Sequence, residues 1–424
     1  MTPPDAAGTG FAAHARSAVQ SEDAPAGSAA GRSNLGDVCA VLWPPPASAS
    51  LFRGRPARGR EGDLLVLPSA GRPRLLVPSG RRASAAAVRR YGEPGSVTAW
   101  AGSRALALAL AGGAAAAGLG GRLRVRAVPG TDTIEAYLRS VLGYEVLIST
   151  HLGAARANRK PVLQLLTPRG EAAGFAKVSV NPLTRDLIRA ERAALDTLAG
   201  EDFRELTVPR VLHYGQWQGR EVLIMTALPV WRRRRALRPG QLAAAMTELT
   251  AVGGRSRGPL AGSGYLAGLR SRLGASPPGP DRAALGAALE ALAAAGAELS
   301  FGAWHGDWPG WNMAATAGGL LVWDWERFAA SVPAGFDLLH YRLQSDVVRR
   351  RRPPAEVAAA CVRDAAGWLA PFGVAAGEAP VVAVLYLAEL SARYLADRQA
   401  EAGARLGRPG TWLIPAIEEA MRKL

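Results

Sequence analysis

The stretch WHGDWPGWNMAATAGGLLVWDWE, residues 304–326, places an acid, an amide and a second acid at short intervals. Asp307 precedes Asn312 by five residues, and Asp324 ends a strand-like run. Metal-dependent phosphoryl transfer needs a carboxylate that orients a hydroxyl, together with an amide and a carboxylate that hold Mg²⁺. The stretch therefore predicts one half of a phosphoryl-transfer site. For His305 we prefer a structural interpretation, in which the imidazole hydrogen-bonds the loop backbone instead of acting as a general base.

Two charged residues upstream can supply the other half. Lys177 lies inside a strand-like run, in a chain that places lysine only at 160, 177 and 423. A compact ammonium suits phosphate binding. Glu191 shares a helical stripe with Leu187 and Leu195, so its carboxylate can face the sheet and pair with the lysine. Taken singly, each is more simply a solvated charge, and Asp324 a residue that caps a hairpin. The order Lys, Glu, Asp, Asn, Asp favours the joint interpretation.

The composition indicates a globular protein with two or three domains, because 49% of the 424 residues are hydrophobic and 20% are charged. The net charge of +16 is compatible with a nucleic-acid partner, but nearly all the basic residues are arginines in an Ala- and Gly-rich chain. A solvated basic surface explains them more simply, and no interleaved aromatic residues mark a nucleic-acid face. Nucleic acid is therefore not an expected partner.

Cysteine usage and the N-terminus predict a cytoplasmic protein. Cys39 and Cys361 are the only cysteines and stand far apart, which argues against a disulfide framework or a zinc site. The N-terminus lacks the basic start and apolar core of a signal peptide. The apolar run Ala105–Gly121 consists largely of Ala and Gly, so we interpret it as a buried helix followed by a loop. No membrane partner is expected.

Local patterns divide the chain into four parts. Residues 1–34 have no periodicity and predict a disordered tail. Residues 35–130 predict an accessory α+β segment without a catalytic motif, 131–229 a sheet with one helix, and 230–424 a mainly helical region that contains 304–326.

Hydrophobic periodicity predicts individual elements in these parts. In the accessory segment we expect a strand over Val38–Trp43, a hairpin of Leu64–Leu67 with Leu75–Val77, and helices over Ala83–Tyr91 and Arg104–Ala117. In the sheet region we expect a helix over 134–142, strands over Glu145–Thr150, Val162–Leu166 and Gly174–Val180, a helix over Arg185–Leu198, and strands over Val211–Tyr214 and Glu221–Thr226. In the last region we expect a helix capped by Asp281 that runs to Leu299, a strand over Leu320–Trp323, and helices over about 355–370, 380–398 and 411–423.

The motif His305-Gly306-Asp307 with Asn312, followed by Asp324-Trp325-Glu326, resembles the signature of the aminoglycoside phosphotransferase and choline kinase group. That group shares the protein-kinase-like fold and carries His-Gly-Asp-x-x-x-x-Asn followed by a metal-binding Asp-x-Glu. The resemblance covers about residues 140–424 in element order. It implies an α+β fold of two lobes, with a five-stranded antiparallel N-lobe sheet, one N-lobe helix and a mainly helical C-lobe. The segment 35–130 has no counterpart in that layout.

The resemblance also implies a role for each matching residue. Asp307 would be the catalytic base, Asn312 and Asp324 the metal ligands, and Asp337 a brace for the catalytic loop. Lys177 would bind the α- and β-phosphates of ATP, with Glu191 as its anchor. The further residues that it implies are Ser149 and Thr150 in a phosphate-covering loop over 149–156, Thr226 and Leu228 in an adenine-binding hinge over Thr226–Pro229, and Glu326 as a supporting or substrate-facing acid.

The predicted function is an ATP- and Mg²⁺-dependent phosphotransferase that moves the γ-phosphoryl group to a hydroxyl of a small molecule, such as a sugar, an amino alcohol or an aminoglycoside-like acceptor. The alternative is a pseudokinase-like regulator that binds nucleotide with little catalysis, although the complete acidic set favours the enzyme. The segment 231–300 is rich in arginine, which mildly favours a neutral or anionic acceptor over a polycation. These arginines are the run Arg232–Arg235, then Arg238, Arg255, Arg257, Arg270 and Arg272.

Overall fold

The computed structural model describes residues 29–52, 63–90, 97–113, 121–153, 157–230, 235–238, 240–401, 404 and 406–424. The chain divides into two compact units. Unit 1 comprises residues up to 133 together with 146–149 and 166–171, and unit 2 comprises 134–145, 150–165 and 172–424. Every predicted site residue except Ser149 belongs to unit 2.

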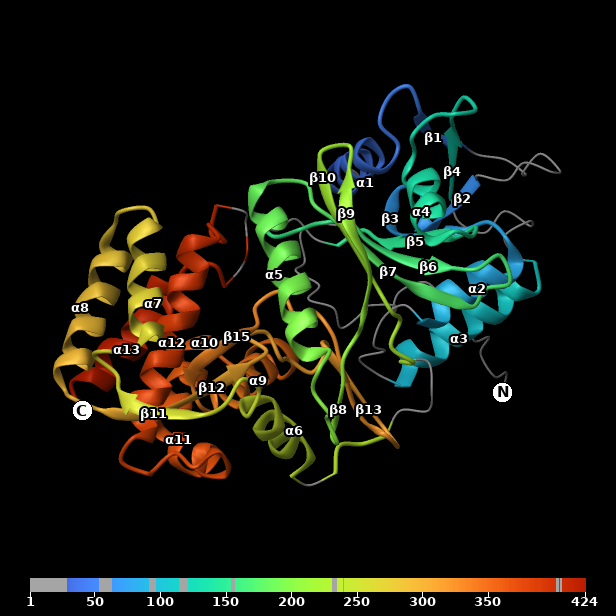
Figure 1. The fold of residues 1–424 in the computed structure, drawn as a ribbon. Helices are drawn as coiled ribbons and strands as arrows, with labels where there is room; N and C mark the ends of the chain where they lie inside the picture. The colour runs from blue at the N-terminus through green and yellow to red at the C-terminus, as the bar shows by residue number, and fades with distance from the viewer. Residues whose placement is uncertain are drawn as a thin grey trace, which may run out of the picture. The chain divides into compact units, whose positions relative to one another are not determined.

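The architecture is α+β, with one large sheet whose nine strands follow the order β1-β4-β2-β3-β5-β6-β7-β10-β9 (Figure 1). The five strands predicted for 131–229 are all present and consecutive in this order: β5 (Leu147–His151), β6 (Val162–Leu166), β7 (Ala172–Val178), β10 (Arg220–Met225) and β9 (Val211–Trp217). The predicted total of five strands is wrong, because four strands from the first 130 residues continue the same hydrogen-bonded order. A sheet edge offers unpaired backbone groups to any further strand, and local sequence patterns do not reveal such pairing.

The described part of unit 1 combines strands with three helices. The hairpin predicted around Ala70 and Gly71 is present, since β2 and β3 pair antiparallel. The elements of unit 1 that precede β5 are α1 (Ala29–Leu42), β1 (Ser48–Phe52), β2 (Asp63–Ser69), β3 (Arg72–Pro78), α2 (Arg81–Arg90), α3 (Val97–Ala111) and β4 (Gly121–Arg126). Residues 114–120, at the end of the predicted helix Arg104–Ala117, lie outside the described residues.

The strand predicted at Val38–Trp43 is wrong, because this stretch belongs to helix α1. Its buried residues are Leu35, Val38 and Leu42, which recur at helical spacing, whereas Asp37 between them is exposed. A short apolar run cannot by itself distinguish a buried strand from a helix. The helix also begins at Ala29, so the predicted disordered tail is wrong for 29–34, and residues 1–28 lie outside the described residues.

Unit 2 contains the C-terminal strands of the large sheet and most of the helices. Helix α5 (Pro182–Leu198) begins with a capping box of Asn181 and Thr184, which satisfies free backbone N–H groups at its first turn. The other helices and short strands of unit 2 are α4 (Ile134–Leu142), β8 (Leu206–Thr207), α6 (Gln241–Thr250), β11 (Ser256–Pro259), α7 (Gly264–Ala275), α8 (Pro280–Ala294), β12 (Glu298–Trp304), β13 (Met313–Thr316), β14 (Gly319–Val322), β15 (Ala329–Pro333), α9 (Phe336–Gln344), α10 (Pro354–Arg363), α11 (Ala365–Leu369), α12 (Ala379–Ala396) and α13 (Leu413–Met421).

Two small sheets position the segment 304–326. One has the order β11-β12-β15 and the other the order β13-β14-β8. The loop that carries Asp307 therefore connects a strand of the first sheet to a strand of the second, and Asp324 lies two residues after the end of β14. The predicted hairpin is present, with Met313 paired to Val322. This arrangement ties both predicted acids to short, buried strands.

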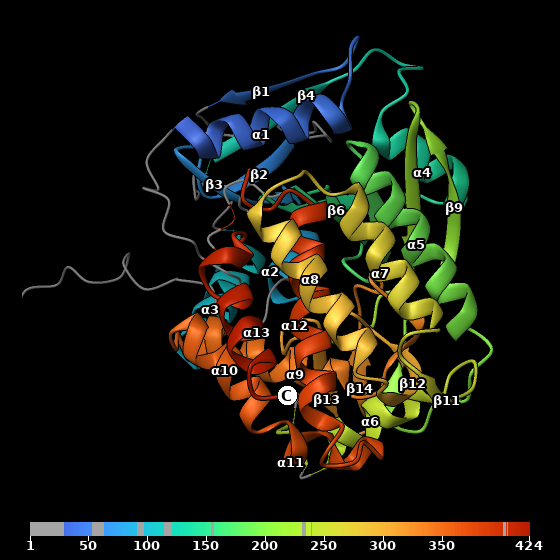
Figure 2. The ribbon, with the colours of Figure 1, turned by 90° about the vertical axis from the view of Figure 1, so that its left-hand side faces the viewer.

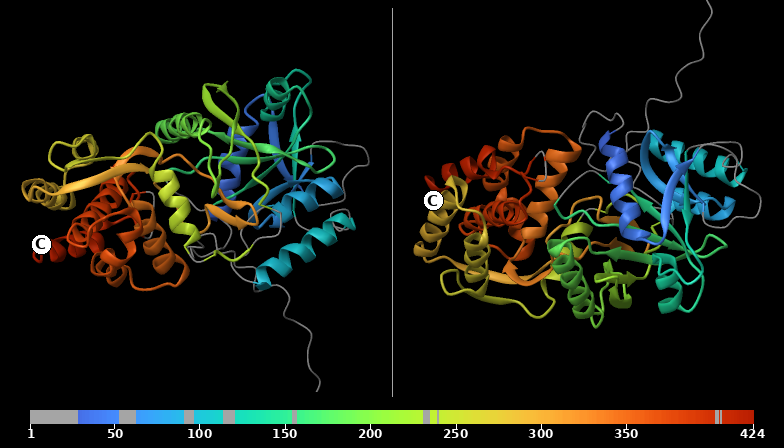
Figure 3. Two further views of the ribbon diagram at one scale, coloured as in Figure 1. Left: turned by 60° about the horizontal axis from the view of Figure 1, so that its bottom comes forward. Right: turned by 90° about the horizontal axis from the view of Figure 1, so that it is seen from above.

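The C-terminal helices form the main hydrophobic core of unit 2. Helices α7 and α8 lie beside α12 (Figure 2), and the yellow-to-red helices stay grouped in both views of Figure 3. Among the described residues, one helix, α12, is long and apolar enough to cross a membrane, but 72% of that window is buried inside the fold. That burial is what a core helix requires.

The helix predicted from Asp281 to Leu299 is shorter than expected and is not capped by Asp281. Its N-cap position is Gly279, and the Asp281 carboxylate instead accepts a hydrogen bond of 3.1 Å from the Gly410 N–H. The helix ends at Ala294, because Gly296 adopts a left-handed φ of 68° and breaks the helical hydrogen bonding. Strand β12, which leads into the Asp307 loop, begins directly afterwards.

Candidate active site

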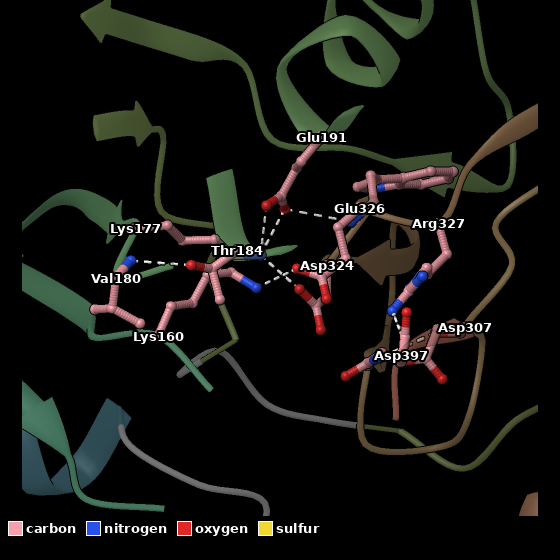
Figure 4. A network of polar contacts seen from close by, with 12 residues as sticks. Lys160, Lys177, Val180, Thr184, Glu191, Asp307, Asp324, Glu326, Arg327 and Asp397 are labelled. Carbon is pink, nitrogen blue, oxygen red and sulfur yellow. Dashed lines mark hydrogen bonds and ion pairs between the residues drawn. The ribbon is translucent and has the colours of Figure 1, made fainter. Parts of the chain in front are cut away.

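A buried ion cluster joins Lys177 of β7, Glu191 of α5 and Asp324 (Figure 4). The Lys177 Nζ lies 2.7 Å from Oε1 of Glu191 and 2.5 Å from Oδ1 of Asp324. Glu191 is fully buried on the same face of α5 as Leu187, Leu195 and Leu198, the stripe that the sequence pattern indicated. The structure thus brings together three of the predicted site residues, which are up to 147 positions apart in the chain.

A second lysine enters this cluster. Lys160 pairs with Glu326, and both side chains are buried. Two of the three lysines in the chain therefore lie among the same acids, and the sequence pattern identified Lys160 only as a rare residue type. A bond that spans 166 positions leaves no periodic signal in the sequence. Glu326, expected as a supporting acid, is the partner of this second lysine.

The cluster carries one net negative charge, because two lysines face three carboxylates. Burial lowers the pKa of Lys177, but Asp324 and Glu191 outweigh that effect and raise the pKa well above its usual range. Burial raises the pKa of Asp324, but the charges of Lys177 and Lys160 outweigh burial and hold the pKa well below its usual range. The lysine is therefore an ammonium and Asp324 a carboxylate at neutral pH.

The donor set around Asp324 fits a hard divalent cation. Oxygen atoms of Glu191, Asp324 and Glu326 lie within 4.8 Å of one another. Mg²⁺ prefers carboxylate and carbonyl oxygens and is bound through one or two carboxylates, with phosphates and water completing its shell. Asn312, also predicted as a metal ligand, is buried beside the Asp307 loop, and its Oδ1 is the amide atom that can bind a cation.

Asp307 lies in the predicted catalytic loop and is partly exposed, with 36% of its side chain accessible. The Asn312 Nδ2 donates to the Asp307 backbone carbonyl at 3.0 Å and to Oδ2 at 3.3 Å. The Asn312 carbonyl also accepts a hydrogen bond of 3.0 Å from the Trp323 N–H, which ties the loop to the residue before Asp324. The two predicted acids are therefore connected through one hydrogen-bonded backbone.

His340, on α9, holds the other oxygen of the Asp307 carboxylate. Its Nε2 lies 2.9 Å from Oδ1 of Asp307, and its Nδ1 lies 3.0 Å from the hydroxyl of Tyr386 on α12. Burial raises the pKa of Tyr386 well above its usual range, so the phenol keeps its proton and can donate to Nδ1. The Nε2 then carries a proton and donates to Asp307, which gives a chain of Tyr386, His340 and Asp307.

The sequence analysis did not identify His340 or Tyr386 as site residues. His340 stands three residues after Asp337, on the same helix face, and this spacing was the available signal. Burial raises the pKa of Asp307, but the hydrogen bond from His340 and its proximity lower it, and the net result is a pKa below the usual range. Asp307 is therefore an ionised, weakly basic carboxylate whose position is fixed by hydrogen bonds.

His305 and Asp337 support the loop backbone. The Asp337 carboxylate accepts hydrogen bonds from the N–H groups of His305 at 2.7 Å and Gly306 at 3.1 Å, which is the bracing contact that the resemblance implied. The two ring nitrogens of His305 are engaged with the Asp307 N–H and the Trp323 carbonyl, each at 3.1 Å. Burial lowers the pKa of His305 to about 4, so the ring is neutral at physiological pH. These contacts leave His305 no free nitrogen for base catalysis.

Two tryptophans of the motif, Trp308 and Trp325, face inward, away from solvent. Trp308 is fully buried, and its Nε1 donates to the Met313 sulfur at 3.3 Å. Trp325 is also fully buried, packs against the His305 ring at 4.4 Å between centroids, and donates from its backbone N–H to Glu191 at 3.3 Å. These two side chains therefore form a buried apolar layer that packs against the polar residues of the site. Trp311 is partly exposed.

Two backbone positions in the site adopt left-handed conformations. Gly306 has a φ of 82°, and a Cβ atom there would lie 2.2 Å from the Arg327 carbonyl oxygen, so only glycine fits. Asp324 has a φ of 75°, which is uncommon for a residue with a side chain and recurs where function demands a particular side-chain direction. The strained position coincides with the acid that contacts Lys177.

The residues predicted for nucleotide contacts have defined local partners. The Ser149 hydroxyl donates to the Leu76 carbonyl at 2.9 Å, and the Thr150 hydroxyl donates to the Val162 carbonyl at 3.0 Å. The Thr226 hydroxyl accepts from the Arg210 N–H at 2.9 Å, and Leu228 packs in a small cluster with Ala314 and Leu321. Their roles toward a nucleotide remain predictions. Within the predicted phosphate-covering loop and arginine run, residues 154–156 and 231–234 lie outside the described residues.

No protein-family model matches the chain, and no curated protein matches it. Among solved structures, it is similar to the apo form of a thermostable mutant of aminoglycoside phosphotransferase APH(4)-Ia, with 12% identity, 68% of this chain and 98% of the other covered, and a TM-score of 0.43. It is also similar to a putative fructosamine-3-kinase from Thermobifida fusca YX-ER1, with 17% identity, 69% and 100% covered, and a TM-score of 0.35. A glucosamine kinase in complex with glucosamine, ADP and inorganic phosphate shows 18% identity, with 91% and 96% covered and a TM-score of 0.31. At these identities and TM-scores, the site geometry has to carry any functional conclusion.

Proposed function

We propose that the chain is an ATP- and Mg²⁺-dependent phosphotransferase of the protein-kinase-like fold, which transfers the γ-phosphoryl group to a hydroxyl of a small molecule. One observation carries this proposal. The buried ammonium of Lys177 contacts both Glu191 and Asp324, and Trp323, the residue before Asp324, is hydrogen-bonded to the loop that presents Asp307. A phosphate-binding lysine, a metal-binding acid and an accessible carboxylate are the parts that phosphoryl transfer requires.

Lys177 binds and positions phosphate oxygens in this proposal. Its ammonium is a compact charge fixed from one side by fully buried Glu191, so its direction is set before a ligand arrives. Asp324 and Asn312 supply oxygen ligands for Mg²⁺, with Glu191 and Glu326 close enough to contribute charge. The bound cation would neutralise negative charge on the β- and γ-phosphates.

Asp307 orients the acceptor hydroxyl and receives its proton late in the transfer. Its Oδ1 is held by His340, which leaves Oδ2, the oxygen beside Asn312, to accept a hydrogen bond from the hydroxyl. A carboxylate with a lowered pKa is a weak base, and this suits a loose transition state in which the acceptor is deprotonated only after most of the P–O bond breaking. Positioning therefore contributes more than basicity.

The base of the nucleotide has a proposed place at the segment Thr226–Pro229. Leu228 is buried against Ala314 and Leu321, with Val230 and Trp323 partly buried on the same cluster. A pocket of about 430 Å³ is lined by Pro229 and Leu321 together with the β13–β14 turn. An apolar wall beside a pocket suits a flat heteroaromatic base.

The test is a panel of small alcohols incubated with γ-³²P-labelled ATP and Mg²⁺. The proposal predicts acid-stable label on at least one acceptor with the wild-type chain, and a rate reduced by roughly two or more orders of magnitude in Asp307→Asn, which keeps the side-chain shape but lacks the charge. Equal rates in the two proteins would reject the role of Asp307. Release of free phosphate with no labelled acceptor across the panel would reject transfer to an alcohol.

A further inference from the structure

A pocket of about 400 Å³ lies in unit 2 beside the catalytic loop. Two of its lining residues reach that loop directly. The Arg393 Nη1 donates to the Gly306 carbonyl at 2.6 Å, and the Arg327 carbonyl packs against the Gly306 Cα. Both arginines also interact electrostatically with Asp307, and Figure 4 shows Arg327 near that acid. Asp307 does not line the pocket, but the two arginines connect the pocket wall to the loop that carries Asp307.

The acids in this pocket already have cationic partners. Glu389 accepts a hydrogen bond from Arg272 at 2.5 Å and lies 4.0 Å from Arg393, and Asp397 pairs with Arg327. Both carboxylates are buried, with side chains 7% and 6% exposed. Three arginines against two acids leave one net positive charge. An ammonium group on a ligand would meet this charge and would have to displace an arginine to gain a counterion.

The wall of the pocket also contains a hydrogen-bond donor that is buried and has no partner among the described residues. The Trp304 side chain is 4% exposed and lines the pocket, and within the described part of the chain its indole Nε1 has no hydrogen-bond partner. The Arg393 guanidinium lies over the same ring, 5.2 Å from its centroid. A buried donor without a partner costs free energy, and a ligand oxygen at this position would remove that cost.

From these three observations we propose that this pocket binds the phosphoryl acceptor, and that the acceptor is a hydroxylated molecule without ammonium groups, such as a sugar or a sugar acid. The inference rests on the proposed phosphotransferase function and adds to it the class of substrate. The pocket selects by offering hydrogen-bond donors and a net positive charge to ligand oxygens. A polycationic acceptor is selected against for the same reason.

Three probes that share a primary hydroxyl and differ in charge test this selection: glucose, glucosamine and gluconate. Equilibrium binding to the full chain, measured by saturation-transfer NMR, is expected to show gluconate and glucose binding more tightly than glucosamine. Trp304→Phe removes the indole N–H from the pocket wall together with part of the ring under Arg393, and is expected to weaken glucose binding about fivefold. It should leave the affinity for ATP unchanged.

Arg272→Gln tests the predicted direction of the charge preference. This arginine is half exposed, and its loss removes the excess positive charge, so the ratio of gluconate to glucosamine affinity is expected to fall about threefold. Arg270→Gln is the matched control, because Arg270 lies on the same helix but pairs with Glu290 and does not line the pocket. An unchanged ratio in Arg272→Gln, or an equal change in the control, would overturn the inference.

The outcomes separate this inference from the proposed function. Binding in the expected order without phosphoryl transfer would support the pocket and reject the phosphotransferase. Transfer with a higher kcat/KM for glucosamine than for glucose and gluconate would reject the proposed selectivity and leave the phosphotransferase standing. Absence of binding by all three probes, or affinities that Trp304→Phe does not alter, would reject the pocket as the acceptor site.

Discussion

The Lys177 cluster and the Asp307 loop hold their acids by different means. Around Lys177, opposite charges compensate one another, since two lysines lie among three carboxylates, of which Glu191 and Glu326 are buried and Asp324 is partly exposed. Around Asp307, hydrogen bonds hold the acid, because His340 and Asn312 contact the carboxylate and Tyr386 contacts the His340 ring. A charge-compensated cluster can exchange one partner for a phosphate or a cation, whereas a hydrogen-bonded chain fixes geometry in advance. The comparison suggests that the first region binds and the second aligns.

The largest expected effect comes from removing the central charge of the first region. Lys177→Met leaves Glu191 buried without its counterion, so the free energy of unfolding should fall by about 3–5 kcal/mol, as measured by urea denaturation. Lys423→Met is the matched control, because Lys423 is an exposed surface residue paired with Glu419 and its loss should leave stability nearly unchanged. Equal stability of the two variants would show that the cluster is not held by charge.

A pH effect should test the neutral state of His305 in the loop that carries Asp307. The pKa of His305 falls from an ordinary 6.5 to about 4 on folding, because burial disfavours the imidazolium. The free energy of unfolding is unaffected by His305 above pH 6.5. It decreases by up to about 3 kcal/mol as the pH falls toward 4, because the unfolded chain binds a proton that the folded chain does not. His305→Gln, which cannot titrate, should lack this part of the acid destabilisation.

Wild type has to be compared with His305→Gln, because Asp337 also titrates in this pH range. Its ionisation changes the stability in the opposite direction to that of His305. Burial raises the pKa of Asp337 to about 7, although the N–H groups of His305 and Gly306 lower it, so its ionisation in the folded state opposes stability as the pH rises. Identical pH profiles for wild type and His305→Gln would contradict the assignment of a neutral, buried His305.

A smaller effect should come from the chain that aligns Asp307. His340→Leu removes the donor to Oδ1 and should lower kcat about tenfold, with the KM for ATP unchanged. The acid limb of the pH–rate profile should move to higher pH, because the hydrogen bond from His340 is one of the influences that lower the pKa of Asp307. His340→Gln places an amide nitrogen near the position of Nε2 and should recover most of the rate.

A packing role for His340 would give a different result. Both variants would then lose rate equally, and neither would shift the pH limb. Tyr386→Phe provides an intermediate case, since it removes the hydroxyl that fixes the imidazole tautomer but leaves the donor to Asp307 in place.

Sequence periodicity predicted the parts of the site that depend on local pattern. The buried stripe of α5 placed Glu191 toward the sheet, and the strand around Lys177 and the hairpin before Asp324 are present as expected. The Lys160–Glu326 pair and the His340–Asp307 bond join distant segments, so no local pattern encodes them. The nine-stranded sheet and helix α1 escaped prediction for related reasons, because strand pairing is non-local and a short apolar run fits either structure.

The most direct test of the central claim compares wild type and Asp307→Asn in two measurements on the same preparations, ATP affinity and the single-turnover rate of label transfer to an acceptor. If the Lys177 cluster binds ATP and Asp307 aligns the acceptor, the two proteins should have equal ATP affinity, because the substitution does not alter the cluster. The transfer rate should be at least about a hundredfold lower in Asp307→Asn. Tight ATP binding with no transfer in either protein, or equal transfer in both, would contradict these roles.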